Sequence, residues 1–146
     1  MPNANVYHFG VLSSTMHMAW VRQVCGRLES RYRYSNKLVY NNFPWPSDVA
    51  DTMKAAVAAA GEGVLAARAA CPGQTLADLY DALAMPRALR AAHAKLDRAV
   101  DKCYRSAPFS SDRQRVEFLF GLYERLCRPA LPPASPSPAR RRSPRR

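Results

Sequence analysis

Residues 9–46 read FGVLSSTMHMAWVRQVCGRLESRYRYSNKLVYNNFPWP, and this stretch decides how the first third of the chain folds. Apolar residues recur at helical spacing over residues 11–25 and cover much of the girth of that helix, which indicates burial. Ser13 or Ser14 can cap the start of the helix, and Gly26 can end it. The pattern therefore predicts one buried helix over residues 11–25.

Two short extended pieces follow this helix, near residues 30–34 and residues 37–40, with Ser35-Asn36 as the turn between them. In an extended run, successive side chains point to opposite faces. One face is then polar and holds Glu29, Arg31 and Arg33, and the other holds Ser30, Tyr32 and Tyr34. Because two strands alone are marginally stable, this ribbon is either a hairpin or the edge of a larger sheet.

The polar face of the ribbon carries groups that suit the reading of base pairs. Arginine matches the guanine edge in the major groove, and glutamate can accept a hydrogen bond from the cytosine amino group. Neighbouring Glu29 and Arg31 could therefore read the two halves of one C·G pair. The residues expected to contact the DNA backbone or to support the strand are Arg33, Lys37, Tyr32 and Tyr34.

The same block resembles the end of the target-recognition domain of MmeI-like proteins. These are single-chain DNA adenine methyltransferases that usually also carry an endonuclease. In that family, the segment similar to GRLESRYRYS holds two specificity positions, two residues apart, which are often Glu with Arg or Lys with Asp. Here they fall on Glu29 and Arg31. VYNNFPWP (residues 39–46), TLADLYD (75–81) and MP (85–86) also fit the family's C-terminal region, so the resemblance covers residues 6–127.

The resemblance implies a division of the chain and a set of partners. Residues 1–46 would be the end of a DNA target-recognition domain, and residues 47–127 a helical C-terminal domain. Double-stranded DNA would be the partner, together with the catalytic portion of a methyltransferase if the gene is split. S-adenosylmethionine would be the cofactor of the full-length enzyme, which is several times longer.

The motifs for catalysis are absent from this sequence. It has no glycine-rich loop suited to S-adenosylmethionine, no Asn-Pro-Pro-aromatic motif for a flipped adenine and no acidic-plus-lysine nuclease cluster. NNFPWP has its aromatics and prolines in a different order, so Phe43 and Trp45 are predicted to anchor an extended exit from the sheet. No catalytic or cofactor-binding residue is predicted, and whether the chain is an enzyme stays open.

From residue 47 onward the pattern predicts a bundle of about four helices, which makes the fold mainly α with a small β-ribbon. A long helix starts at Ser47-Asp48, and a break is expected near Gly61 and Gly63. Later helix starts are signalled by Thr75 with Asp78, by Pro86, and by Ser111 with Gln114. Asp97 and Asp101 are expected to form solvated salt bridges with Arg98, Lys102 or Arg105 rather than a metal site.

Charge is unevenly distributed along this chain, whose net charge is +11. Residues 1–46 carry five cations against one acid, residues 47–127 carry eleven against ten, and residues 128–146 carry six arginines and no acid. Such a basic excess is the expected footprint of phosphate binding. The Pro-, Ser- and Arg-rich tail at 128–146 is predicted to be disordered. Additional DNA binding, nuclear localisation and frame-shifted read-through all stay open as explanations of the tail.

The cysteines and the hydropathy exclude several classes of protein. Four cysteines stand far apart, at positions 25, 71, 103 and 127, so neither a zinc site nor a disulfide framework is predicted. His17 lies among apolar residues and is predicted to be a hydrogen-bonded core residue rather than a ligand. With no signal peptide and no apolar run of membrane-spanning length, a cytoplasmic protein with reduced thiols and no membrane partner is expected.

Two hypotheses compete with DNA recognition. The first is a stand-alone helical protein-interaction module without DNA specificity, which would bind its partner through an apolar surface around Trp20 and Trp45. The second is a decayed remnant that folds poorly. DNA affinity with a steep salt dependence would favour recognition of DNA over both.

Overall fold

The computed structural model describes residues 3–29 and 31–128 of the 146-residue chain. The elements in these ranges, in chain order, are α1 (Val6–Leu12), α2 (Thr15–Val24), β1 (Gly26–Leu28), β2 (Arg31–Arg33), the π-helical turn η1 (Asn36–Tyr40), α3 (Asp51–Ala69), α4 (Leu76–Leu79), α5 (Arg87–Tyr104) and α6 (Asp112–Cys127). The predicted fold class, mainly helical with a small β-ribbon near the N-terminus, is confirmed. The tail that was predicted to be disordered lies outside the described residues, apart from Arg128.

The first predicted helix is two helices in the structure. Ser14 caps α2 by accepting a hydrogen bond from the backbone N–H of His17, as one of the two predicted caps. Its buried hydroxyl also donates to the carbonyl of Val11, at 2.6 Å. The prediction of one helix over residues 11–25 is therefore wrong at its start, because α1 ends at its C-cap Ser13 and Ser14 caps the start of α2. Gly26 is not the cap of α2 but the first residue of β1.

Two glycines allow α1 to lie close against α3. A Cβ atom on Gly10 would lie only 2.8 Å from Cγ1 of Val57, and one on Gly61 would lie 3.1 Å from Cγ1 of Val6. The first distance is too short for a Cβ atom, and the second is tighter than most Cβ contacts. The break expected near Gly61 and Gly63 is wrong, since α3 runs unbroken through both. Gly61 serves the packing of two helices and not a bend.

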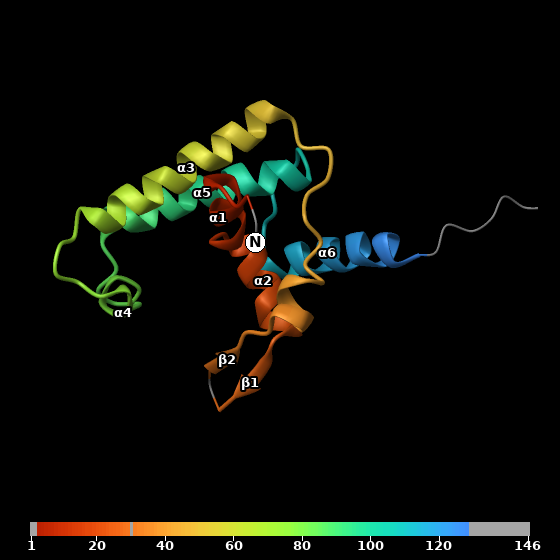
Figure 1. Ribbon diagram of the computed structural model, residues 1–146, viewed down its shortest axis with the longest axis horizontal. Helices are drawn as coiled ribbons and strands as arrows, with labels where there is room; N and C mark the ends of the chain where they lie inside the picture. Colours follow the sequence, from red (N-terminus) through yellow and green to blue (C-terminus); the bar gives the residue numbers. More distant parts are fainter. Residues whose placement is uncertain (1–2, 30, 129–146) are drawn as a thin grey trace, which may run out of the picture.

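The helices share one hydrophobic core. α3 and α5 lie side by side, α1 packs against α3, and α2 packs against α6, while the β-ribbon extends from the end of α2 (Figure 1). The largest side chains with under 2 % exposure include Met16, Leu89, Leu96 and Leu119, and they belong to a continuous cluster with Trp20. The core therefore unites the N-terminal helices with the helices that follow residue 47.

The two carboxylates of α5 bind groups on other helices. Asp97 accepts hydrogen bonds from the backbone N–H of Thr15 at 2.7 Å and from its hydroxyl at 2.8 Å, so it caps the start of α2. Asp101 is buried and accepts from Nε of Arg115 at 3.1 Å and from a terminal nitrogen at 2.7 Å. The prediction of solvated salt bridges within α5 is wrong, because charge-assisted bonds at this shielded interface are stronger than exposed pairs.

Most helix starts in the second half follow their local signals. Thr75 and Asp78 form the predicted capping box of α4, and α5 begins one residue after Pro86. Ser111 caps α6, but the side chain of Gln114 accepts from the backbone N–H of Ser110, at 3.1 Å. α3 begins at residue 51, later than the predicted start at residues 47–48.

The segment NNFPWP ties the ribbon to this core, as predicted. Phe43 is buried, and its ring packs edge-on against His17 with the ring centroids 4.6 Å apart. The ring of Trp45 is half-buried and packs against that of Phe43, with the centroids 5.5 Å apart. The hydroxyl of Tyr104 donates to the carbonyl of Pro44, at 3.1 Å. These contacts make the segment an anchor between the ribbon and α5.

The described residues contain no membrane-spanning helix, no metal-binding group of side chains and no disulfide. None of the described helices is long and apolar enough to cross a membrane. In the same residues, no group of three or more His, Cys, Asp or Glu side chains is placed to hold a metal ion. The four thiols are all free, and that of Cys25 is buried.

Candidate nucleic-acid interface

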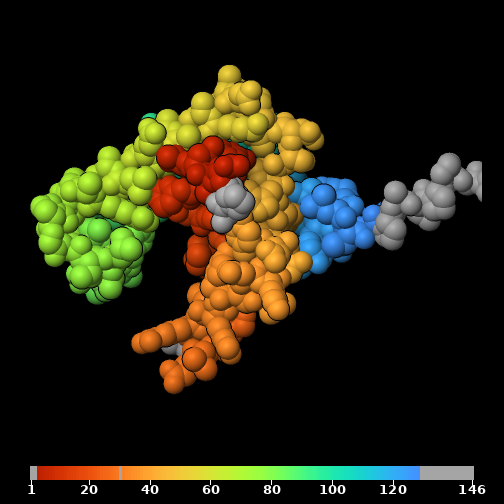
Figure 2. Space-filling model, in the orientation of Figure 1, coloured from red at the N-terminus to blue at the C-terminus, as the bar shows by residue number. Residues whose placement is uncertain are grey.

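The ribbon is an antiparallel hairpin of β1 and β2, residues 26–33, with Gly26 opposite Arg33, Arg27 opposite Tyr32 and Leu28 opposite Arg31. It forms a narrow projection from the helical body (Figure 2). Every described residue of the hairpin is exposed, including Leu28 at 66 %. The hairpin therefore contributes little to the core, and most of its surface faces solvent.

The two faces of the hairpin differ in chemistry. Residues directly opposite each other in an antiparallel pair point to the same face, so Arg27 and Tyr32 share one face, and Leu28, Arg31 and Arg33 share the other. The guanidinium carbon of Arg27 lies 4.8 Å from the centre of the Tyr32 ring, close enough for a cation–π interaction. The predicted alternation of Arg31, Tyr32 and Arg33 is confirmed.

Glu29 does not lie on the strand, which corrects one expectation. It occupies the turn after β1, with a φ angle of 56°. A left-handed residue interrupts the strict alternation of an extended chain, so Glu29 does not share a strand face with Arg31 by periodicity. The difference arises because β1 begins at Gly26, directly after α2, and the turn falls earlier than predicted. Glu29 and Arg31 nevertheless both stay exposed at this end of the hairpin.

The second predicted strand, residues 37–40, is the helical turn η1. Ser35 caps it by accepting from the backbone N–H of Leu38, at 3.4 Å. The amide of Asn42 donates to the carbonyl of Lys37 at 2.9 Å, and Val39 is fully buried with its carbonyl bonded to Trp20 Nε1 at 3.1 Å. The burial of Val39 and the hydrogen bonds from Ser35 and Asn42 therefore override the strand preference of these residues. As a result, Lys37 lies beside the hairpin instead of on it.

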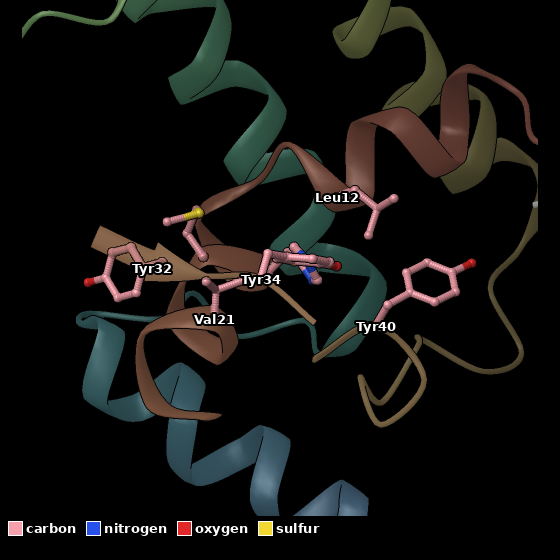
Figure 3. Close-up of a pocket in the computed structure, with 7 residues that line it drawn as sticks. Leu12, Val21, Tyr32, Tyr34 and Tyr40 are labelled. Carbon is pink, nitrogen blue, oxygen red and sulfur yellow. The ribbon is translucent and has the colours of Figure 1, made fainter. Parts of the chain in front are cut away.

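An aromatic groove separates the hairpin from α1 and α2. It has a volume of about 580 Å³ and is lined by Leu12, His17, Met18, Val21, Tyr32, Tyr34 and Tyr40. Figure 3 shows Tyr34 between Tyr32 and Tyr40 along this groove. Tyr32 and Tyr34 therefore share a face, as the alternation predicted, and this face is directed toward the helices.

One hydrogen bond fixes the chain just after β2 to the body. His17 Nε2 and the Tyr34 hydroxyl are 3.1 Å apart, and His17 Nδ1 has no partner among the described residues. Burial lowers the pKa of His17 to about 4. Burial, followed by the neighbouring Tyr40 and Cys25, raises the pKa of Tyr34. His17 is thus the core residue that the sequence predicted, although only one of its ring nitrogens is satisfied.

The charged side chains around the hairpin are available to a partner. Within the described residues, no ion pair involves Glu29, Arg31, Arg33 or Lys37. By contrast, Arg22 on α2 pairs with Asp112 and is not free in this way. The eight-residue hairpin, residues 26–33, carries Arg27, Glu29, Arg31, Tyr32 and Arg33. Tyr34 and Lys37 follow it in the sequence.

Sequence reasoning missed Arg27 and overstated Trp20. Gly26 was interpreted as the end of a helix, so Arg27 was not expected to lie on a strand. In the structure Gly26 begins β1, and Arg27 pairs with Tyr32 across the hairpin. Trp20 is only 2 % exposed and packs against Phe43 and the aromatics of α6. The prediction of an apolar interaction surface is therefore wrong for Trp20, because this side chain is buried.

Comparison with known families identifies the class of protein. Residues 1–47 match the family described as the MmeI target recognition domain, and residues 49–131 match the family described as the MmeI C-terminal domain. The chain therefore belongs to the MmeI family, as its motifs predicted.

Two relatives that match this chain are much longer proteins. It is 43 % identical over 124 residues to DNA methyltransferase A of Bacillus subtilis (strain 168), a match that covers 85 % of this chain and 14 % of the relative. It is also similar to the Type IIL restriction-modification enzyme MmeI, solved in complex with DNA, with 46 % identity and a TM-score of 0.81 over 86 % of this chain. That match covers 17 % of the MmeI chain, so this chain spans less than a fifth of either relative.

Proposed function

We propose that this chain is the DNA-recognition and helical C-terminal portion of a site-specific DNA adenine-N6 methyltransferase of the restriction-modification type, acting in the cytoplasm. The supporting observation is the exposed hairpin that presents Glu29, Arg31 and Arg33 without ion-pair partners among the described residues. Residues 1–46 supply recognition in this proposal, and residues 47–127 supply the scaffold. Double-stranded DNA is the partner.

Base reading is assigned to the end of the hairpin. Arg31 donates two hydrogen bonds to O6 and N7 of guanine, and Glu29 accepts from N4 of the paired cytosine. A two-stranded β-ribbon fits the major groove, which is about 12 Å wide. The turn of the hairpin is its most distant part from the helices (Figure 1), so these side chains reach the base edges first.

Backbone contacts are assigned to the cations nearer the helices. Arg33 lies at the base of β2, and Lys37 lies on η1 beside it, where both can bind phosphate oxygens. Tyr32 and Tyr34 have a positioning role, since Tyr32 stacks with Arg27 and the hydroxyl of Tyr34 bonds to His17. Contacts of this kind fix the register of the hairpin on the duplex without reading sequence.

Methyl transfer is assigned to the remaining portion of the enzyme, in the same polypeptide or in a split partner. S-adenosylmethionine supplies the methyl group there. The aromatic groove does not fit that cofactor, because no carboxylate lines it to accept from the ribose hydroxyls. This chain contributes binding and positioning of the DNA.

Exchange of the two specificity residues tests the proposal. Glu29→Lys combined with Arg31→Asp, in the full-length enzyme that carries this chain, is expected to change the base pair that the enzyme requires. Sequencing of methylated adenines in a randomised DNA library measures the recognised site. Arg33→Gln is the matched control, since it should slow methylation of every site without changing the site. An unchanged recognition sequence in the double variant would refute the assignment of Glu29 and Arg31.

A further inference from the structure

A second group of exposed cations lies far from the hairpin, on α5. Lys95, Arg98 and Lys102 follow one another at intervals of three and four residues and so share one face of the helix. We refer to these three residues as the α5 row. It extends over eight residues, and the seven steps from Lys95 to Lys102 correspond to about 10 Å along the helix. No ion pair of the described residues involves any of the three side chains.

The α5 row borders two hollows. One, of about 260 Å³, lies between α5 and α3 and is lined by the α5 row together with Ala99 and with Met53, Ala56 and Ala60 of α3. The other, of about 230 Å³, lies at the end of α5 and is lined by Arg98, Lys102, Arg105, Asp101 and residues 106–108. The α3 side of the first hollow carries no charge, so the cations of α5 dominate its potential.

The acid near the α5 row is already neutralised. Asp101 lines the second hollow, but both of its oxygens accept hydrogen bonds from Arg115. Arg105 adds a fixed positive charge, because it donates to the carbonyls of Ala107 and Pro108 and lies 3.7 Å above the centre of the Phe109 ring. Asp97 keeps its negative charge, but it binds Thr15 on α2 and lines neither hollow. The surface is therefore strongly positive and is preorganised at one end.

We propose that the face formed by α3 and α5 binds the phosphodiester backbone of a nucleic-acid duplex. Three exposed cations in a row, bordered by two hollows, suit a ligand whose negative charges recur every few ångströms. The binding would be independent of sequence, because no side chain of this face is placed on a projection that could enter a groove. α5 lies against α3, at the opposite end of the body from the hairpin (Figure 1), so the two basic surfaces are separate.

The inference deepens the proposed function, since it rests on duplex DNA as the ligand. It adds a contact that belongs to the helical half of the chain. The sequence has four lysines, which can serve as probes of the two surfaces. Lys37 lies beside the hairpin, Lys95 and Lys102 belong to the α5 row, and Lys54 lies on α3. Lys54 pairs with Asp51 and serves as an internal reference.

Chemical acetylation of lysines in the intact chain, with and without a 30-base-pair duplex, tests the inference. Mass spectrometry gives the rate at each lysine. We expect the duplex to slow acetylation of Lys95 and Lys102 several-fold and to leave Lys54 unchanged. Protection of Lys37 alone would overturn the inference and leave the proposed function standing. Protection of Lys95 and Lys102 alone would support the inference and count against the hairpin, and protection of no lysine would overturn both.

The salt dependence of duplex binding provides a second measurement. Replacing all three residues of the α5 row by Gln removes three phosphate contacts, so the slope of log K against log salt should become shallower by about 2–3. The matched control replaces three exposed cations elsewhere on the helices, Arg90, Arg113 and Arg125, by Gln. Glutamine is a good helix former, so both variants should fold. Equal slopes in the two variants would overturn the inference.

Discussion

The hairpin and the helical body of this protein are stabilised in different ways. Leu96, in the body, is fully buried between helices, whereas Leu28, in the hairpin, is 66 % exposed. The body also contains a buried ion pair between Asp101 and Arg115, while the charges of the hairpin have no such partners among the described residues. The body therefore depends on its own contacts, and the hairpin is free to form contacts with a partner.

This difference has a consequence for sequence variation. Substitutions in a close-packed core cost free energy of unfolding, and substitutions at exposed positions are usually neutral. A family can thus exchange the side chains of the hairpin without loss of the fold. Under the proposed function, exchange of Glu29 and Arg31 is therefore expected to change specificity and to leave the helical body intact.

The largest expected effect is the loss of a core side chain. Leu96→Ala should lower the free energy of unfolding by about 2–5 kcal/mol, because it removes buried surface and leaves a cavity between α5 and its neighbours. Leu28→Ala is the matched control and should change the free energy by less than about 0.5 kcal/mol. Urea unfolding followed by circular dichroism measures both. Similar losses in the two variants would contradict the comparison between body and hairpin.

The pH dependence of stability is the next largest effect. Because the pKa of buried His17 is about 4, below its ordinary value near 6.5, the unfolded chain takes up a proton at this residue before the folded chain does. Stability is therefore lost as the pH falls from about 6.5 towards 4, by about 2 kcal/mol at pH 5. Urea unfolding at pH 7 and at pH 5 measures this loss. His17→Gln should be less sensitive to pH, and equal sensitivity in the two proteins would contradict the assignment.

The close approach of α1 and α3 gives an effect of comparable size. Gly10→Ala places a methyl group 2.8 Å from Cγ1 of Val57, so the helices must separate, at a cost of about 1–3 kcal/mol. Gly26→Ala, in the hairpin, is the matched control, since a Cβ atom there would have no neighbour within 4 Å. Thermal unfolding measures both variants. If Gly10→Ala were as stable as the control, α1 and α3 would separate without cost, and the prediction would be wrong.

The sequence was informative wherever a signal acted within a few residues. Ser14, Thr75 and Ser111 each cap a helix that their hydrogen-bonding side chains predicted. The aromatic anchor around Phe43 and the alternation of Arg31 with Tyr32 were equally local. These features depend on the identity of neighbouring residues, and they needed no knowledge of the rest of the fold.

The errors arose where a distant part of the chain decided the outcome. Thr15, the partner of Asp97, lies 82 positions away on α2, so periodicity along α5 could not indicate it. Val39 joins the core beside Trp20, and this burial turned a predicted strand into η1. The left-handed conformation of Glu29 depends on where β1 starts, and therefore on the end of α2. The sequence placed Glu29, Arg31 and Arg33 in the ribbon but did not indicate the turn at Glu29, and their role as readers of DNA stays a prediction.

The smallest effect on stability is expected where the effect on binding is large. Arg31 and Arg33 are exposed on the hairpin and have no ion pair within the described residues, so replacing both by Gln should change the free energy of unfolding by less than about 0.5 kcal/mol. Each removed phosphate or base contact should nevertheless weaken the binding of duplex DNA, by about 1–3 kcal/mol for a bidentate base contact.

Fluorescence anisotropy of a labelled duplex and urea unfolding of the same samples measure the two quantities. Arg113→Gln combined with Arg125→Gln is the control, since it removes the same charge from the exposed surface of α6. Because the hairpin is attached to the body by few contacts, its charges can be removed without strain in the core. If Arg31→Gln with Arg33→Gln instead destabilised the fold as much as it weakened binding, these arginines would have a structural role, and the separation between the hairpin and the body would not hold.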